Sequence, residues 1–576
     1  MRITRTGMRS FPDSASAAHE RIRTQPGNPG YLTRYPGRCL VIALLALWAL
    51  VATAAESPEA VTLDPVAAGK RIYLEGVLSD GTPLSKVVSR NQPDGDVACV
   101  RCHRRSGLGG MEGGELVPAI TGDYLFRNHL KVVTEPAPRR IKRWAYTENA
   151  FKRALQNGID VMGDPISTAM PRYALAQPDI QALMAYLHTL SHAKSPGIDE
   201  QTVHIATVVD RRLPQAEREA LIQTASRYVD HENRVIQAQE KRAAFSNRQN
   251  NWNVKSFRRW KWHLWELDGD PESWPEQLQT HYEQQPVFLL VGGAVSGPWS
   301  PIDRFCEARA LPCLFPHTNM PAQGERSYFT FYYSRGLELE ANVLVTHLSR
   351  KTVRPERILQ IAPDNQTGRY ATESLDLALA GSTISTETRH FNDIEGLKSI
   401  AADALGSHRD LMLWLNDEEL RVFREILGTH PSNAQLYQSS SLLSQPLDPS
   451  GGTGEEAITL IHPFTLPWQE SDGQSEGFLS KHGILDKRYY RLQSETFTAF
   501  ATLGQVLKRI KHNLVREYFM EQLESLSENL RVTSLYPRFS LGPYQRTVSK
   551  GAYILPLSVV TDPARDVKQT WVIPSL

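Results

Sequence analysis

Apolar side chains recur in two different rhythms along this chain, and the rhythm changes near residue 200. Before that point they recur every three or four residues, in stretches that begin at Pro65, Thr147 and Pro178. After it, short apolar runs alternate with amphipathic stretches, beginning with residues 203–209. The first rhythm is typical of helices, and the second of buried strands that alternate with helices. The pattern predicts a helical N-terminal domain followed by a larger α/β region.

The predicted N-terminal helices carry their own end signals. Asp64 precedes Pro65 as an N-cap, Thr147 can cap the second helix, and Gly158 follows that helix as its stop. Pro178 lies in the first turn of the third helix. The apolar stripes of the three helices are Val66, Gly69, Ile72 and Tyr73; Phe151, Ala154 and Leu155; and Ile180, Leu183, Met184, Leu187 and Leu190.

The α/β region contains predicted strands joined by helical stretches. A linker at residues 196–202, rich in turn-forming residues, separates it from the helical domain. About 375 residues are too many for a single core, so we expect two lobes with parallel sheets. The predicted strands are 203–209, 262–267, 287–293, 311–315, 358–362 and 411–415, and the first predicted helices are 214–227 and 301–310.

The N-terminus has the features of an export signal. Residues 1–38 carry seven arginines, and residues 39–55 carry no charge. Small residues at 52–54 predict cleavage near Ala54 or Ala55, so that residues 1–55 form a signal peptide and the mature protein lies in the periplasm. The alternative is an uncleaved membrane anchor, because the apolar run just reaches the shortest length that can cross a bilayer. The long basic segment also allows a later start at Met8.

The charge balance argues against a nucleic-acid partner. Of the 64 basic and 63 acidic side chains, residues 1–55 hold seven and two, which leaves a mature net charge near −4. Nucleic-acid binding needs a basic surface, which this composition does not indicate. No later segment is apolar for long enough to span a membrane, so membrane contact is expected only through the N-terminal segment.

The sequence from Cys99 to His103, Cys-Val-Arg-Cys-His, has the spacing of a covalent haem attachment site. Cys99 and Cys102 would form thioether bonds to the porphyrin, and His103 would bind the iron. A second iron ligand would come from the stretch after the motif, where Met170 precedes Pro171. Met184 lies on an apolar helical stripe and is expected in the core. The competing iron ligands are Met111, Met162 and His129.

The order of helix, CxxCH, glycine-rich loop, helix, Met-Pro and final helix resembles a class I cytochrome c over residues 60–195. The resemblance implies one covalent haem c held by Cys99, Cys102, His103 and Met170. A His/Met pair fills both axial positions, which implies outer-sphere electron transfer. We therefore assign no catalytic residues and expect an electron carrier.

Residues 203–576 resemble the type I periplasmic binding proteins, the branched-chain amino-acid receptor family of ABC importers. The local patterns that carry the resemblance are residues 291–297, 313–319 and 362–368. It implies a ligand cleft between the lobes, where strands end. Thr367 stands where amino-acid binders usually place an aromatic, which puts an amino-acid ligand in doubt. The implied cleft residues are Ser296, His317 and Thr318 on one wall, and Thr367 with Asn416 or Asp417 on the other.

Cys306 and Cys313 remain as a close pair after the haem cysteines and Cys39 of the signal are assigned. In an oxidising compartment such a pair often forms a disulfide. The alternative is two small buried thiols, at the end of a helix and the start of a strand.

The sequence thus predicts a multidomain protein, an all-α cytochrome c domain followed by a two-lobed α/β binding-protein-like domain. Our leading hypothesis is periplasmic electron transfer, in which the second module docks a partner or responds to a ligand. Similar fusions resemble accessories of quinoprotein alcohol oxidation, so a quinoprotein dehydrogenase is the partner we expect. The alternatives are a solute receptor of an ABC-type importer with an accessory haem, and a haem-based redox sensor.

Overall fold

The computed structural model describes one compact unit, Leu63–Leu576. The predicted signal peptide, residues 1–55, lies outside the described residues. No helix in the described part of the chain combines the length and the hydropathy needed to cross a bilayer. The described residues are 64–574 apart from 86–96, 113, 134–138, 191–194, 246–257, 324–326, 408–409, 431, 446, 448–456, 467–472, 512, 527–533, 543–544 and 561–569.

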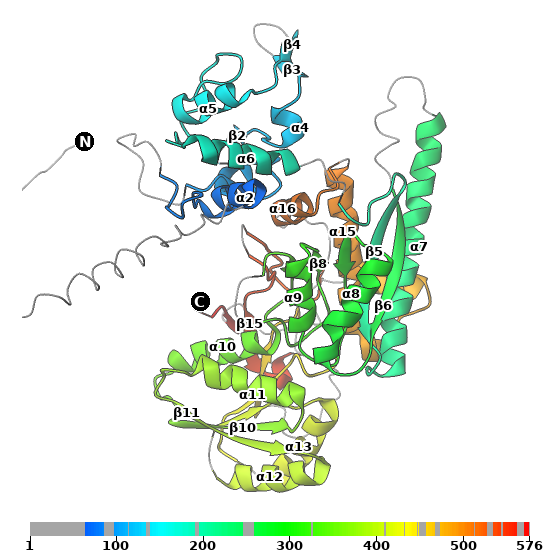
Figure 1. Ribbon diagram of the computed structural model, residues 1–576. Coiled ribbons are helices and arrows are strands. Elements are labelled where there is room, and N and C mark those ends of the chain that lie inside the picture. Colours follow the sequence, from blue (N-terminus) through cyan, green and yellow to red (C-terminus); the bar gives the residue numbers. More distant parts are fainter. Residues whose placement is uncertain are drawn as a thin grey trace, which may run out of the picture. The chain divides into compact units, whose positions relative to one another are not determined.

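The N-terminal domain is built from helices, as the apolar stripes predict (Figure 1). Helices α2 and α6 pack against each other, and Gly69 lies where they touch, since a Cβ there would be 2.0 Å from the carbonyl oxygen of Ala182. Two short antiparallel hairpins, which the sequence pattern does not predict, join the helices. The elements are α2 (Pro65–Glu75), α3 (Val100–His103), β1 (Gly110–Glu112), β2 (Glu115–Val117), α4 (Gly122–Leu125), β3 (His129–Val133), β4 (Arg139–Arg143), α5 (Glu148–Asn157) and α6 (Gln177–Thr189).

The predicted end signals of these helices are present. Asp64 accepts a hydrogen bond from the backbone N–H of Val66 at 3.3 Å, and the hydroxyl of Thr147 accepts one from Ala150 at 3.3 Å. Gly158 ends α5 with φ at 69°, in the left-handed region that favours glycine. These bonds satisfy helix-end groups that would otherwise have no partner.

Lobe 1 contains a parallel sheet with the strand order β6-β5-β7-β8-β9. Helix α7 runs far beyond the predicted 214–227, because its apolar stripe continues through the buried Val229 and Ile236. The elements are β5 (Thr202–Asp210), α7 (Gln215–Phe245), β6 (Arg259–Leu267), η2 (Pro271–Ser273), α8 (Trp274–Gln284), β7 (Leu289–Val291), α9 (Ser300–Ala308), β8 (Cys313–Leu314) and β9 (Thr330–Phe331), with α14 (Gly473–Lys481), η3 (Lys487–Tyr489), α15 (Tyr490–Ile510) and α16 (Arg516–Leu526) from later in the chain.

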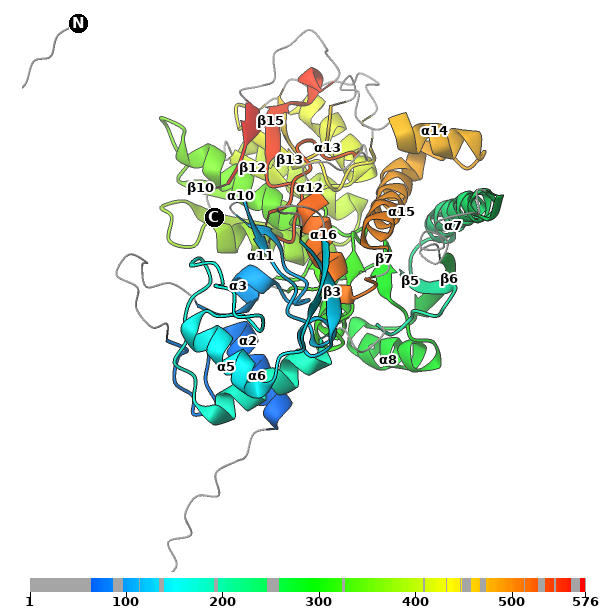
Figure 2. The same ribbon diagram turned by 90° about the horizontal axis from the view of Figure 1, so that it is seen from above.

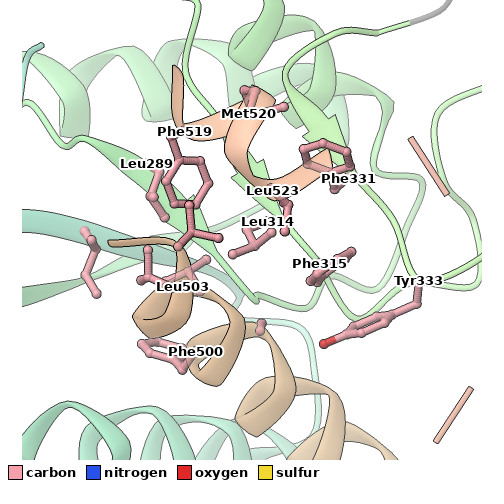
Figure 3. Close-up of a cluster of buried hydrophobic side chains, with 14 of the residues drawn as sticks. Leu289, Leu314, Phe315, Phe331, Tyr333, Phe500, Leu503, Phe519, Met520 and Leu523 are labelled. Atoms are coloured by element: carbon pink, nitrogen blue, oxygen red, sulfur yellow. The ribbon is translucent and has the colours of Figure 1, made fainter. Parts of the chain in front are cut away.

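Helices cover both faces of this sheet, as its alternating side chains require. Val203 and Ile205 of β5 point into one cluster with α7, α15 and α16, whereas Ala206 and Val208 point into another with α8 and α9. Figure 2 shows α7, α14 and α15 on the same side of the lobe. Figure 3 shows residues of α15 and α16 packed against Leu314 and Phe331.

Lobe 2 contains a mixed sheet with the strand order β11-β10-β12-β13-β14-β15-β16. Its first strands are parallel, and β15 and β16 pair antiparallel at one edge. Leu359 and Ile361 of β10 face α12 and α13, and Ile358 and Ala362 face α10 and α11. The elements are α10 (Gly336–Ser349), β10 (Arg357–Pro363), α11 (Gln366–Ala378), β11 (Ser385–Phe391), α12 (Ile394–Gly406), β12 (Asp410–Leu413), α13 (Asp417–Thr429), β13 (Leu436–Ser439), β14 (Ile458–His462), β15 (Ala552–Pro556), η4 (Leu557–Val559) and β16 (Trp571–Val572).

The chain passes between the lobes at neighbouring segments. The backbone N–H of Tyr332, on the way into lobe 2, donates to Arg546 O at 2.8 Å, and Ser549 N–H donates to Tyr333 O at 2.8 Å. Thr465, after β14, donates to Leu535 O at 2.7 Å. Parallel strands in two helix-covered lobes agree with the predicted two-lobed α/β architecture.

The core of lobe 1 is expected to dominate its stability. Leu503 of α15 is fully buried, so Leu503→Ala should lower the free energy of unfolding by about 2 to 5 kcal/mol. Leu377 of α11 is 69% exposed, and Leu377→Ala should change it by about 0.5 kcal/mol or less. Urea unfolding followed by tryptophan fluorescence measures both. Equal effects of the two substitutions would contradict this packing.

Candidate functional site

The first candidate site surrounds the CxxCH segment. Cys99 precedes α3, and Cys102 and His103 lie within it. His103 is 7% exposed, and its Nδ1 donates to Pro118 O at 3.1 Å. Burial lowers the pKa of His103 more than this hydrogen bond raises it, which favours a neutral ring. A neutral imidazole with Nδ1 committed to a carbonyl leaves Nε2 for a metal.

Met170 packs against the same apolar cluster as Cys99. Its carbonyl oxygen accepts from Arg172 Nη1 at 2.5 Å, which ties down the loop that presents it. Of the competing ligands, Met111 is 64% exposed, and His129 packs against Tyr124 with tilted rings whose centroids are 4.7 Å apart. The cluster also contains Val100 of α3, the helix that carries the buried imidazole of His103. An imidazole and a thioether are donor types that fit a haem iron.

The second candidate site is a buried polar network where the lobes join. Arg491 and Glu495, one turn apart on α15, form an ion pair at 2.8 Å (Nε to Oε1). Tyr536 donates to Glu495 Oε1 at 2.7 Å. The guanidinium also donates to Ser441 O of lobe 2 at 2.9 Å and to Asn319 Oδ1 at 2.8 Å. The network therefore links α15 of lobe 1 with the segment that follows β13 of lobe 2.

His317 is a partly exposed member of this network. It follows β8, and its side chain is 21% exposed, whereas that of Glu495 is 2% exposed. His317 Nδ1 donates to Glu495 Oε2 at 2.6 Å. Its Nδ1 is thus anchored by a buried carboxylate, while its Nε2 makes no hydrogen bond with the described residues.

The charges around Glu495 keep it ionised. Burial alone would raise the pKa of Glu495, but Arg491 and His317 outweigh burial and lower the pKa to about 2. A carboxylate whose pKa is lower in the folded state than in the unfolded state stabilises the fold at pH values above its ordinary pKa. That stabilisation is lost as the pH falls from about 4.5 toward 2.

The implied cleft residues Ser296, Thr318, Asn416 and Asp417 make hydrogen bonds within their own lobes. Ser296 is exposed and hydrogen-bonds to the buried Asp210 through its N–H and its hydroxyl, and Thr318 Oγ1 accepts from Met320 N at 3.0 Å. Asn416 caps α13 in a capping box with Glu419. Asp417 accepts from the N–H and hydroxyl of Ser444 at 2.9 and 2.8 Å.

The loop of Ser296 and the first turn of α11 come together across the lobes. A Cβ on Gly297 would be 2.8 Å from Gln366 Oε1, and Thr367 is the next residue of α11. Tyr370 of the same helix donates to Pro321 O at 3.1 Å. The two predicted walls therefore touch at Gly297 and Gln366, whereas Asn416 and Asp417 make the local contacts above.

Sequence reasoning finds His317 but misses its partners. Arg491, Glu495 and Tyr536 lie far from it in sequence, with Glu495 178 residues away. The one local signal is the Arg–Glu spacing of four residues, which places the two charges on the same face of a helix.

Cys306 and Cys313 are both buried and are thiols in this structure. They lie close enough to hydrogen-bond, and burial raises the pKa of Cys306 well above its usual range. Neighbouring buried thiols are compatible with either alternative of the sequence analysis, so the disulfide stays a prediction.

Several solved structures resemble this chain at low identity. A fatty acid ABC transporter substrate-binding protein from Thermomonospora curvata is 12% identical, with a TM-score of 0.44, and covers 66% of this chain and 93% of its own. A branched-chain amino acid ABC transporter protein from Thermus thermophilus with bound valine is 9% identical, with a TM-score of 0.46, and covers 66% and 96%. No protein-family model and no curated protein matches the sequence. Likeness at this level identifies no ligand for this chain.

The buried ion pair should matter far more than an exposed pair of the same spacing. Arg491→Met leaves Glu495 buried without its main cation and should cost about 3 to 5 kcal/mol of unfolding free energy. Arg421→Met removes the exposed pair with Glu425 and should cost about 0.5 kcal/mol or less. Arg491→Met should also lose less stability on acidification below about pH 4.5, because the pKa of Glu495 is then less depressed. Urea unfolding at several pH values measures both effects, and similar costs for the two variants would contradict the network.

Proposed function

We propose that this chain is an exported binding protein whose two α/β lobes hold a small molecule between them. His317 carries the proposal, because its ring is fixed by buried Glu495 at 2.6 Å and still reaches the surface where the lobes meet. In open α/β sheets ligands bind beyond the carboxyl ends of the strands, which is the position of His317 after β8. The contact of Gly297 with Gln366 supports a cleft that can close.

A ligand that prefers the closed lobes should stabilise them. The test measures the melting temperature of the full chain with amino acids, alcohols, aldehydes and small carboxylic acids. A true ligand at a hundredfold excess over Kd should add about 2.7 kcal/mol of stability. His317→Ala should abolish the shift, whereas His390→Ala, at an exposed position of β11, should retain it. A shift that survives in His317→Ala would place the site elsewhere, and no shift with any compound class would overturn the receptor proposal.

A second function, electron transfer by a covalent haem, is favoured by the CxxCH segment and by the buried, oriented ring of His103. A bound haem supplies one-electron redox chemistry. Cys99 and Cys102 would anchor it, His103 and Met170 would hold the iron, and the apolar cluster around them would exclude water. A periplasmic redox protein, such as a quinoprotein dehydrogenase, would be the partner.

The haem ligands can be tested one by one. The chain expressed with haem-attachment machinery should gain the mass of one haem and show a low-spin spectrum with the weak long-wavelength band of an iron–thioether bond. Met170→Ala should abolish the band and lower the reduction potential. Met162→Ala should leave both unchanged. The opposite result would move the iron ligand to Met162. Haem that resists acid extraction after Cys99→Ala with Cys102→Ala would show that these two cysteines are not its covalent anchors.

A further inference from the structure

The loop that follows His103 is held by lobe 1. Ser106 N–H donates to Glu521 Oε1 at 2.8 Å, and the Ser106 hydroxyl donates to Glu521 Oε2 at 2.6 Å. Both residues are buried, and they lie 415 residues apart in the sequence. One carboxylate on α16 thus takes two hydrogen bonds from a residue three positions after the predicted iron ligand.

Charged neighbours extend this contact. Arg104 Nη1 lies 3.8 Å from Glu524 Oε2, and Arg546 Nη1 lies 2.5 Å from Glu524 Oε1. The guanidinium of Arg105 stacks over the ring of Tyr328, 4.0 Å from its centre. The loop from Arg104 to Ser106 therefore meets α16 and its neighbours through each of its side chains.

Glu521 is an unusual choice if its only task is to hold the domains together. Glu524 has two arginines beside it, whereas Glu521 takes hydrogen bonds from the neutral Ser106. A buried charge whose direct hydrogen-bond donors are neutral is costly, and a neutral side chain of the same shape would make a similar link at lower cost. A negative charge at this place has a further effect, because it acts on any redox centre held by the same loop.

We propose that Glu521 is a positioning residue for the predicted haem: it holds the loop after His103 through Ser106, and its negative charge lowers the reduction potential. The proposal rests on the proposed electron transfer. An ionised carboxylate near the haem favours the ferric form, which carries one more positive charge than the ferrous form.

The titration of Glu521 supports this role. Burial raises the pKa of Glu521 to about 7, although Ser106 and Arg104 act in the opposite direction. The titratable groups that face it are Arg104 of the loop, Glu517 and Tyr518 of α16, Tyr73 of α2 and Tyr328 of lobe 1. The tyrosines have raised pKa values and stay neutral near pH 7, whereas Glu521 changes charge there.

The test is a mediated redox titration of the full haem-bearing chain at about pH 5.5 and about pH 8.5, below and above the pKa of Glu521. Glu521→Gln keeps the shape and removes the charge, so its potential should exceed that of the unmodified chain at the higher pH. At the lower pH the two should converge, because Glu521 is then protonated. Glu276→Gln, the same change at an exposed position of α8, should follow the unmodified chain at both pH values.

A second variant keeps the proposal testable if Glu521→Gln fails to fold. Ser106→Ala removes one hydrogen bond to the ionised form, so the pH at which the potential changes should rise. Hydrogen exchange of the peptide that contains Ser106 should quicken in the same variant, which reports the contact without using the haem.

The outcomes separate this proposal from the function it rests on. An unmodified chain that carries no haem overturns the electron-transfer proposal, and this one with it. A haem-bearing chain whose potential is the same in Glu521→Gln and Glu276→Gln at both pH values overturns this proposal alone. A pH-independent change would show a structural effect without the charge effect, which also overturns it.

Discussion

The buried ion pair between Arg491 and Glu495 is the interaction on which the arrangement of the lobes depends. Two charges withdrawn from water are tolerated only when their hydrogen-bonding groups are satisfied. Here the partners come from three separate segments, through His317, Tyr536 and Ser441. Because Arg491 also donates to Ser441 O of lobe 2, the lobes cannot separate at this point without breaking a hydrogen bond of the buried guanidinium.

Helices α15 and α16 connect this junction to the N-terminal domain. They pack against each other and share one apolar core with the sheet of lobe 1 (Figure 3). Glu495 on α15 meets the lobe junction, and Glu521 on α16 meets the loop after His103. The two proposed functions of this chain therefore meet in one pair of helices.

The sequence by itself determined the parts of this protein that depend on neighbouring residues. Helix caps at Asp64 and Thr147 are present because the donor and acceptor lie two or three residues apart. Alternating strands and helices indicated parallel sheets because burial on both faces imposes a local apolar run. The CxxCH segment predicts haem attachment, because covalent attachment and iron binding need a fixed local spacing.

Only the tertiary structure decided which distant groups meet. Glu495 joins His317 across 178 residues, and Glu521 joins Ser106 across 415, and neither pairing leaves a periodic signal. The sequence pattern predicts a shorter α7, because many polar residues interrupt the apolar stripe in the second half of the helix. Packing against β6 and α15 maintains the helix over its full length. Asn416 and Asp417 lie beyond a strand, yet local capping and loop contacts take up their side chains. Which side chains pair with one another depends on the free energy of burial and desolvation, and the folded chain alone determines which groups are buried together.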